Sequence, residues 1–141
     1  MEIEHLRTRL EVYLHIVWAT YGRQPLIDAK IERLVHNTIH QQAKASGCEV
    51  IATGGLADHV HVLVKVPSTV SVAELTKRIK GGSSRAQSLD APENPLRWQR
   101  SYSATSLHRS LVPRVKHYVQ TQQERHAACT LWDELEVTGE R

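Results

Sequence analysis

Hydrophobic and polar positions alternate along several stretches of the chain, and this alternation predicts β-strands. The first strand is predicted over residues 10–20. Residues 49–56 and 59–66 form two more, and the short connection at residues 57–58 predicts that these two pair as an antiparallel hairpin. A polar, serine-rich stretch at residues 98–107 is predicted to be the fourth strand.

Other stretches carry apolar residues at helical spacing. Asp28 can cap a helix that runs to about residue 46, where Gly47 ends it in the position that best tolerates a left-handed backbone. Ser71 and Glu74 form a Ser-x-x-Glu capping box for a second helix. The paired glycines at residues 81–82 are expected to break that helix.

A third helix is predicted from about residue 110 to beyond Gln122. Its start is placed near residue 110 because Pro113 is tolerated only in the first turn of a helix. The order strand–helix–strand–strand–helix–strand indicates an α+β fold of the ferredoxin-like, split βαβ type: an antiparallel sheet with helices on one face. The last helix is then appended at the C-terminal side, and the second sheet face is expected to be open for a ligand or a second subunit. We expect one domain over residues 1–141, with a core at about 10–126 and an acidic tail, about 133–141, that frays.

Composition restricts the setting in which the protein works. No apolar run approaches the length of a membrane span, and the first residues lack the apolar centre of a signal peptide. The two cysteines, Cys48 and Cys129, match no zinc-ligand spacing, and nothing demands that they form a disulfide. We therefore expect a cytoplasmic protein with no membrane partner.

The net charge of +3 conceals a strong asymmetry. Residues 65–125 hold eleven Lys and Arg against four Asp and Glu, while the rest of the chain is acidic. Such a split favours one surface that faces a polyanion, with ordinary solvated helix faces as the alternative. The candidate DNA-binding residues are Lys77, Arg78, Lys80, Arg85, Arg97 and Arg100.

Two local patterns support these candidates. The four residues from Lys77 to Arg85 surround the expected glycine break, where exposed backbone amides and cations can bind phosphates. Arg97 and Arg100 alternate with Trp98 and Tyr102, as charged and aromatic residues do in proteins that bind single-stranded nucleic acid. Trp98 is nevertheless more typical of a core residue.

Two imidazoles stand two residues apart on the third predicted strand. Because successive side chains of a strand point to opposite faces, His59 and His61 share one face. Two neutral imidazoles held in this way form half of a divalent-metal site. The alternative is a pair that is solvated or satisfied by carboxylates. The neighbouring Asp58 either orients a ligating imidazole or serves as a turn residue.

On the last predicted helix, Tyr118 and Gln122 are four residues apart and project from one face. A lone tyrosine there is usually half-buried core, but the helix around it is unusually polar. The phenol is a candidate nucleophile toward phosphorus, and the Gln122 amide oxygen can complete a metal site with His59 and His61.

A strand His-hydrophobe-His followed by a helical Tyr-x-x-x-Gln resembles the single-tyrosine HUH transposases of bacterial insertion sequences. The resemblance extends over nearly the whole chain, including the opening strand and turn, the glycine-bearing second helix and the tryptophan-led strand. Ser101 stands where that family commonly has glycine, and Arg125 replaces the first of two histidines that often follow the glutamine. These departures leave Tyr118 and Gln122 in place.

The resemblance implies a chemistry. Tyr118 would attack a phosphodiester of single-stranded DNA at hairpin-bearing element ends and become linked to the 5′-phosphate. His59, His61 and Gln122 would hold Mg²⁺ or Mn²⁺. The family also implies a homodimer in which the tyrosine helix of one subunit can serve the histidines of the other. The alternatives are a domesticated relative that processes chromosomal hairpins, a DNA-binding regulator that no longer cuts, and a metal hydrolase without a covalent step.

Overall fold

The computed structural model describes residues 8–139, which form a four-stranded antiparallel sheet in the order β2-β3-β1-β4. The strands are β1 (Tyr13–Ala19), β2 (Glu49–Leu56), β3 (His59–Lys65) and β4 (Ser103–Leu107). The α+β class and the antiparallel hairpin are confirmed. The N-terminal residues considered for a signal peptide, and the last two residues of the acidic tail, lie outside the described part.

The fourth strand is shorter than predicted. It starts at Ser103, and Trp98 contributes only an isolated bridge to Thr20. In the stretch before β4, the Lys80 ammonium donates to the carbonyl oxygens of residues 99, 100 and 101 at 2.8, 3.2 and 3.1 Å. These carbonyls are bound by a side chain, so they do not join the ladder of the sheet.

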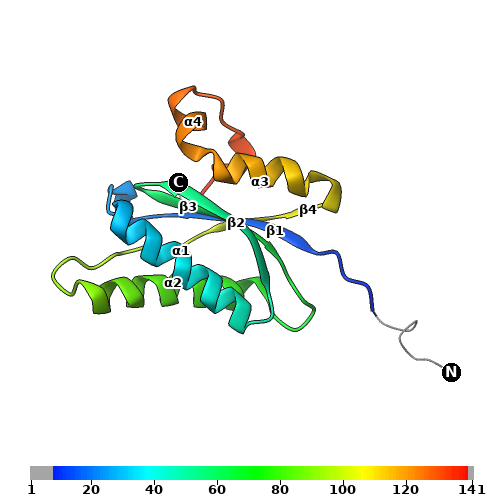
Figure 1. The fold of residues 1–141 in the computed structure, drawn as a ribbon, viewed down its shortest axis with the longest axis horizontal. Coiled ribbons are helices and arrows are strands. Elements are labelled where there is room, and N and C mark those ends of the chain that lie inside the picture. Colours follow the sequence, from blue (N-terminus) through cyan, green and yellow to red (C-terminus); the bar gives the residue numbers. More distant parts are fainter. Residues whose placement is uncertain (1–7, 140–141) are drawn as a thin grey trace.

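Helices α1 (Ala29–Ala45) and α2 (Val72–Asp90) pack on one face of the sheet (Figure 1). Both predicted caps are present: Asp28 accepts from the Ile31 amide at 2.9 Å, and Ser71 accepts from the Glu74 amide at 3.0 Å. Gly47 follows α1 with a φ of 80°, as its role at the helix end requires.

The prediction that Gly81 and Gly82 break the second helix was wrong. The helix continues through Gly81 and Gly82 to Asp90. Gly82 faces α1, where a Cβ would lie 2.9 Å from Gln42 Cγ, so its small size serves the packing of the two helices. The expected cluster of exposed backbone amides is therefore absent, since residues inside a helix use their amides for the helix.

The opposite sheet face carries α3 (Val112–Gln120) and α4 (Gln122–Ala127) (Figure 1). Short 3-10 turns lie at Tyr21–Arg23, Arg109–Leu111 and Asp133–Leu135. A second core forms under α3 from Ala52, Leu63, Val115, Tyr118, Val119 and Leu135. The face that was expected to be open is thus covered by the same chain.

As far as it is described, the acidic tail packs against the rest of the chain. Leu135 is buried in the second core, and Thr138 is also buried, with its carbonyl oxygen bound by Gln99 Nε2. The tail is therefore a packed segment that runs beneath α3.

None of the helices in the described residues is both long enough and apolar enough to cross a membrane.

Candidate functional site

His59 and His61 lie on the β3 face that α3 covers, as the strand alternation predicted. Both side chains are buried, and so is Leu63, which continues the same face under α3. Val60 and Val62 point the other way, into the core under α1 and α2. Burial on both faces holds the strand rigidly, so the two imidazoles have fixed positions.

The first imidazole is held by its sequence neighbour. His59 Nδ1 lies 2.8 Å from Asp58 Oδ1, which selects the tautomer with the proton on Nδ1. His59 Nε2 is thereby left to face the site, where Gln122 Oε1 lies 3.2 Å away. This contact is the one that an orienting role for Asp58 requires.

The second imidazole is held by a histidine that the sequence did not indicate. His61 Nδ1 lies 2.8 Å from Nε2 of His15, a buried residue of β1. Burial, and then the proximity of His61, lower the pKa of His15 to about 3. Burial also lowers the pKa of His61 against the opposing influence of Glu136, so both rings are neutral.

Tyr118 reaches this cluster from α3. Its ring centroid lies 6.0 Å from that of His61, and its hydroxyl accepts from the Trp132 amide at 3.1 Å and donates to Glu136 Oε2. Burial, reinforced by the hydrogen bond to Glu136, raises the pKa of Tyr118 to about 12. The phenol is therefore protonated in this arrangement.

Gln122 enters the same site although the helix is interrupted before it. The predicted single helix ends at Gln120, and Thr121, with φ −116° and ψ 36°, separates α3 from α4. Gln122 Nε2 donates to the Tyr118 carbonyl at 3.1 Å, which fixes its amide oxygen between His59 and His126. His59, His61, Tyr118 and Gln122 thus converge within one chain.

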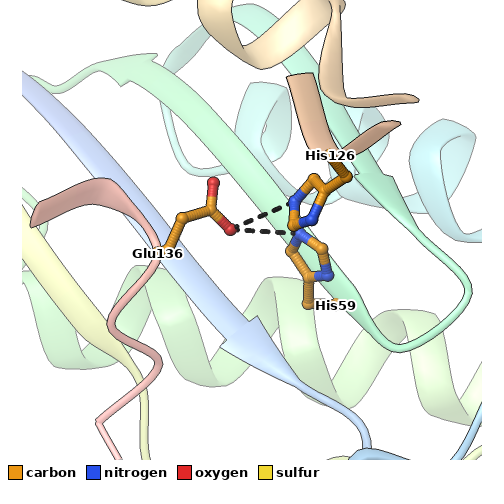
Figure 2. Close-up of side chains that lie close together, drawn as sticks. All are labelled: His59, His126 and Glu136. Atoms are coloured by element: carbon orange, nitrogen blue, oxygen red, sulfur yellow. Dashed lines mark ion pairs between the residues drawn. The ribbon is translucent and has the colours of Figure 1, made fainter. Parts of the chain in front are cut away.

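Glu136 from the C-terminal segment faces His59 and His126 (Figure 2). Its Oε1 is 3.5 Å from His59 Nε2 and 3.4 Å from His126 Nε2, and its Oε2 is 3.3 Å from His61 Nε2. Burial alone would raise the pKa of Glu136, but the hydrogen bond that the Tyr118 hydroxyl donates to it favours the ionised form and lowers its pKa. The carboxylate is therefore ionised.

Three members of the site were missed at the sequence level. His15 stands in the alternating pattern of the first strand, and His126 follows Gln122 by one helical turn. Both residues therefore had a local pattern from which their place could have been predicted. Glu136 had none, because nothing in an acidic tail predicts which carboxylate folds back onto the sheet.

The donor set fits a divalent cation. His61 Nε2 is buried and, within the described residues, makes no hydrogen bond of good geometry, so it offers a lone pair to the site. Among the described residues, the donor atoms of His59, His126 and Glu136 all lie within 4.8 Å of one another, and Gln122 Oε1 lies 3.2 Å from His59 Nε2. Imidazole nitrogens and an amide oxygen suit Mn²⁺ or Mg²⁺.

A cavity of about 520 Å³ opens beside Tyr118, between α3 and the C-terminal segment. Two cations line it: the Arg125 guanidinium lies 5.5 Å from the centre of the Tyr118 ring, and the Arg114 guanidinium lies 5.3 Å from that of Trp132. Asp133 and Glu134 also line this cavity, so two cations and two carboxylates surround the approach to the phenol.

The predicted DNA-binding residues lie elsewhere. Lys77, Arg78 and Arg85 line a surface groove on α2, on the sheet face opposite the histidines. Lys80 holds three backbone carbonyls, and the Arg97 guanidinium lies 4.4 Å from the centre of the Tyr21 ring.

Trp98 and Tyr102 pack against the core under α1 and α2. Trp98 Nε1 also donates to the Lys80 carbonyl at 3.0 Å. In this structure the two rings are packing residues. Arg100, between them, is exposed. A role for any of these residues toward DNA stays a prediction.

The sequence profile described as "Transposase IS200 like" matches residues 8–122. The chain belongs to this family of transposases. The resemblance to single-tyrosine HUH transposases is thereby confirmed, and the matched stretch includes His59, His61, Tyr118 and Gln122. Glu136 lies beyond it. No curated protein gives a significant sequence match.

Two solved structures share the fold of the IS200-like transposase described here. One, a Deinococcus radiodurans protein assigned as a transposase, is 20% identical, with a TM-score of 0.66 over 82% of this chain and 95% of its own. The other is a REP-associated tyrosine transposase bound to a REP hairpin, 13% identical, with a TM-score of 0.62 over 85% of this chain and 73% of its own.

Proposed function

We propose that this transposase cleaves and rejoins single-stranded DNA by transesterification through a 5′-phosphotyrosine intermediate. The observation that carries the proposal is the convergence of Tyr118 with the two histidines of β3 and with Gln122. A phenol buried only for packing has no reason to face three polar groups of this kind.

Tyr118 would supply the nucleophile. Its oxygen attacks the phosphorus, the bond from phosphorus to the 3′-oxygen breaks, and the 5′-phosphate stays attached to the ring. The phenol loses its proton and the departing 3′-oxygen gains one, so the reverse reaction with another 3′-hydroxyl restores both. The ester bond to Tyr118 conserves the free energy of the phosphodiester, so rejoining needs no nucleotide cofactor.

His59, His61 and Gln122 would hold Mg²⁺ or Mn²⁺. Such a cation, when bound, stabilises the charge that develops on the phosphate and favours the phenolate of Tyr118. This help is needed, because a phenol with a pKa of about 12 is a poor nucleophile at neutral pH. Arg125, beside the same ring, adds a fixed positive charge.

The DNA would contact two surfaces. A single strand can approach Tyr118 through the cavity lined by Arg114 and Arg125, while Lys77, Arg78 and Arg85 on α2 would bind phosphates of a hairpin. The fold shared with a transposase that was solved on a REP hairpin supports a hairpin substrate.

A homodimer with the sheets joined edge to edge also remains part of the proposal. In the isolated chain Tyr118 already lies beside His61, so completion of the site by a second subunit would require α3 to be exchanged.

Incubation with hairpin-bearing single-stranded oligonucleotides and Mn²⁺ tests the proposal. We expect a protein–DNA adduct that survives denaturing electrophoresis, and we expect Tyr118→Phe and His61→Ala to abolish it. Tyr118→Phe that still cuts would indicate a metal hydrolase. Hairpin binding by the unaltered chain without any cleavage would indicate a regulator. Either result would overturn the proposal.

A further inference from the structure

Glu136 occupies a position that the proposed reaction does not yet use. Its carboxylate comes from the C-terminal segment, outside the stretch matched by the family profile, yet only 14% of its side chain is exposed. It contacts the two histidines of β3 and the hydroxyl of Tyr118 at once.

The distances around Glu136 fall in the range found between neighbouring ligands of one cation, and the donor atoms of Glu136, His59 and His126 all lie within 4.8 Å of one another. Bonds of about 2.1 Å to a divalent ion place adjacent ligand atoms roughly 3.0–3.5 Å apart, for octahedral to tetrahedral angles. Glu136 Oε1 lies 3.5 Å from His59 Nε2, and Glu136 Oε2 lies 3.3 Å from His61 Nε2. Gln122 Oε1 lies 3.2 Å from His59 Nε2, within the same range.

The segment that carries Glu136 is anchored on both sides. Leu135 is buried in the second core, and the carbonyl of Thr138 is bound by Gln99. The Trp132 amide also donates to the Tyr118 hydroxyl. The carboxylate is therefore held in the cluster by the fold of the segment, whereas an acidic residue on a loose tail would stay in solvent.

We propose that Glu136 is a ligand of the divalent cation held by His59, His61 and Gln122. This inference rests on the proposed function. A carboxylate adds a hard, negatively charged oxygen to two imidazoles and an amide, which strengthens binding of Mn²⁺ and Mg²⁺. The second oxygen of the same carboxylate holds the Tyr118 hydroxyl, so the ligand also positions the nucleophile beside the cation.

His126 is the neighbour that would support this ligand. Its Nε2 lies 3.4 Å from Glu136 Oε1 and 3.1 Å from Gln122 Oε1, so one imidazole contacts both oxygen donors (Figure 2). The donor atoms of His126, His59 and Glu136 all lie within 4.8 Å of one another, so His126 belongs to the same group of possible ligands.

Titration of the full-length chain with Mn²⁺, followed by calorimetry and by loss of the free-ion paramagnetic resonance signal, tests the proposal without any DNA. We expect Glu136→Gln to weaken binding about tenfold or more, and Glu136→Asp to restore part of the affinity. Glu134→Gln is the matched control, because Glu134 is exposed on the same segment; it should bind Mn²⁺ as the unaltered chain does. Melting curves without metal establish that each variant folds.

Unchanged affinity in Glu136→Gln would overturn the proposal. Tighter binding would overturn it too, since it would show that the carboxylate takes the place of the cation and must leave before metal enters. His61→Ala separates this proposal from the one it rests on: if that variant still binds Mn²⁺ normally, the metal site itself is refuted. If His61→Ala loses Mn²⁺ affinity and Glu136→Gln does not, the proposed reaction stands and the proposal that Glu136 is a ligand is refuted.

Discussion

The backbone carbonyl of Val119 on α3 lies directly against Gly54 on β2, in the space that a Cβ would occupy. Gly54 is paired across the sheet with His61. The absence of a side chain at this one position therefore sets how closely α3 approaches the histidines, and with it the distance between Tyr118 and His61.

Gly54→Ala should destabilise the protein, because the added methyl group meets backbone atoms that cannot rotate away. We expect a loss of about 2–3 kcal/mol in the free energy of unfolding, measured by urea denaturation, together with loss of the DNA adduct. Gly81→Ala is the matched control: Gly81 lies inside α2 with open space around its Cα, so alanine should stabilise by about 0.5–1 kcal/mol. A Gly54→Ala variant as stable as the unaltered chain would show that α3 shifts at little cost.

His15 should affect metal binding although it is no ligand. With Nε2 of His61 facing the site, the proton on its Nδ1 is donated to His15 Nε2 at 2.8 Å. His15→Leu removes that acceptor, so we expect about tenfold weaker Mn²⁺ binding by calorimetry. His15→Gln should retain more affinity, because an amide oxygen can accept the same proton. Equal affinities for all three chains would contradict an orienting role for His15.

Lys80 should contribute to stability through the connection before β4. Its ammonium is bound to three carbonyl oxygens, so Lys80→Met would leave these groups without their charged partner. We expect a loss of about 1–3 kcal/mol in the free energy of unfolding, by urea denaturation. Lys77→Met, on the exposed side of the same helix, should change it by less than about 0.5 kcal/mol. Comparable losses in both variants would show that the carbonyl contacts contribute nothing.

His36 predicts a dependence of stability on pH. Burial, together with the charge of His40, lowers the pKa of His36 to about 4, and its Nδ1 contacts Thr53 Oγ1 at 3.2 Å. The folded chain keeps this ring neutral while the unfolded chain protonates it near pH 6.5, so its contribution is complete above pH 6.5 and is lost as the pH falls toward 4.

The measurement compares the unfolding free energies of the unaltered chain and His36→Gln at pH 7 and pH 4. We expect the unaltered chain to lose about 2–3 kcal/mol more than the variant over this range. Equal losses would show that His36 does not titrate in this way and that other groups, such as His15, cause the acid destabilisation.

The sequence by itself determined the local part of the site. Alternation on a strand placed His59 and His61 on one face. The spacing of Tyr118 and Gln122 predicted that they lie close together, which they do, although Thr121 separates their two helices. The caps at Asp28 and Ser71 were also predictable. These features follow from the periods of strands and helices, which depend only on neighbours in the chain.

Only the tertiary structure decided which distant groups meet there. It brought Glu136 and His15 to the imidazoles, placed α3 over a sheet face expected to be open, and bound Lys80 to carbonyls. The path of the C-terminal segment depends on how Leu135 fits the second core and on the close approach that Gly54 permits. Packing of this kind depends on the shapes of surfaces from several elements at once, and no local pattern encodes it.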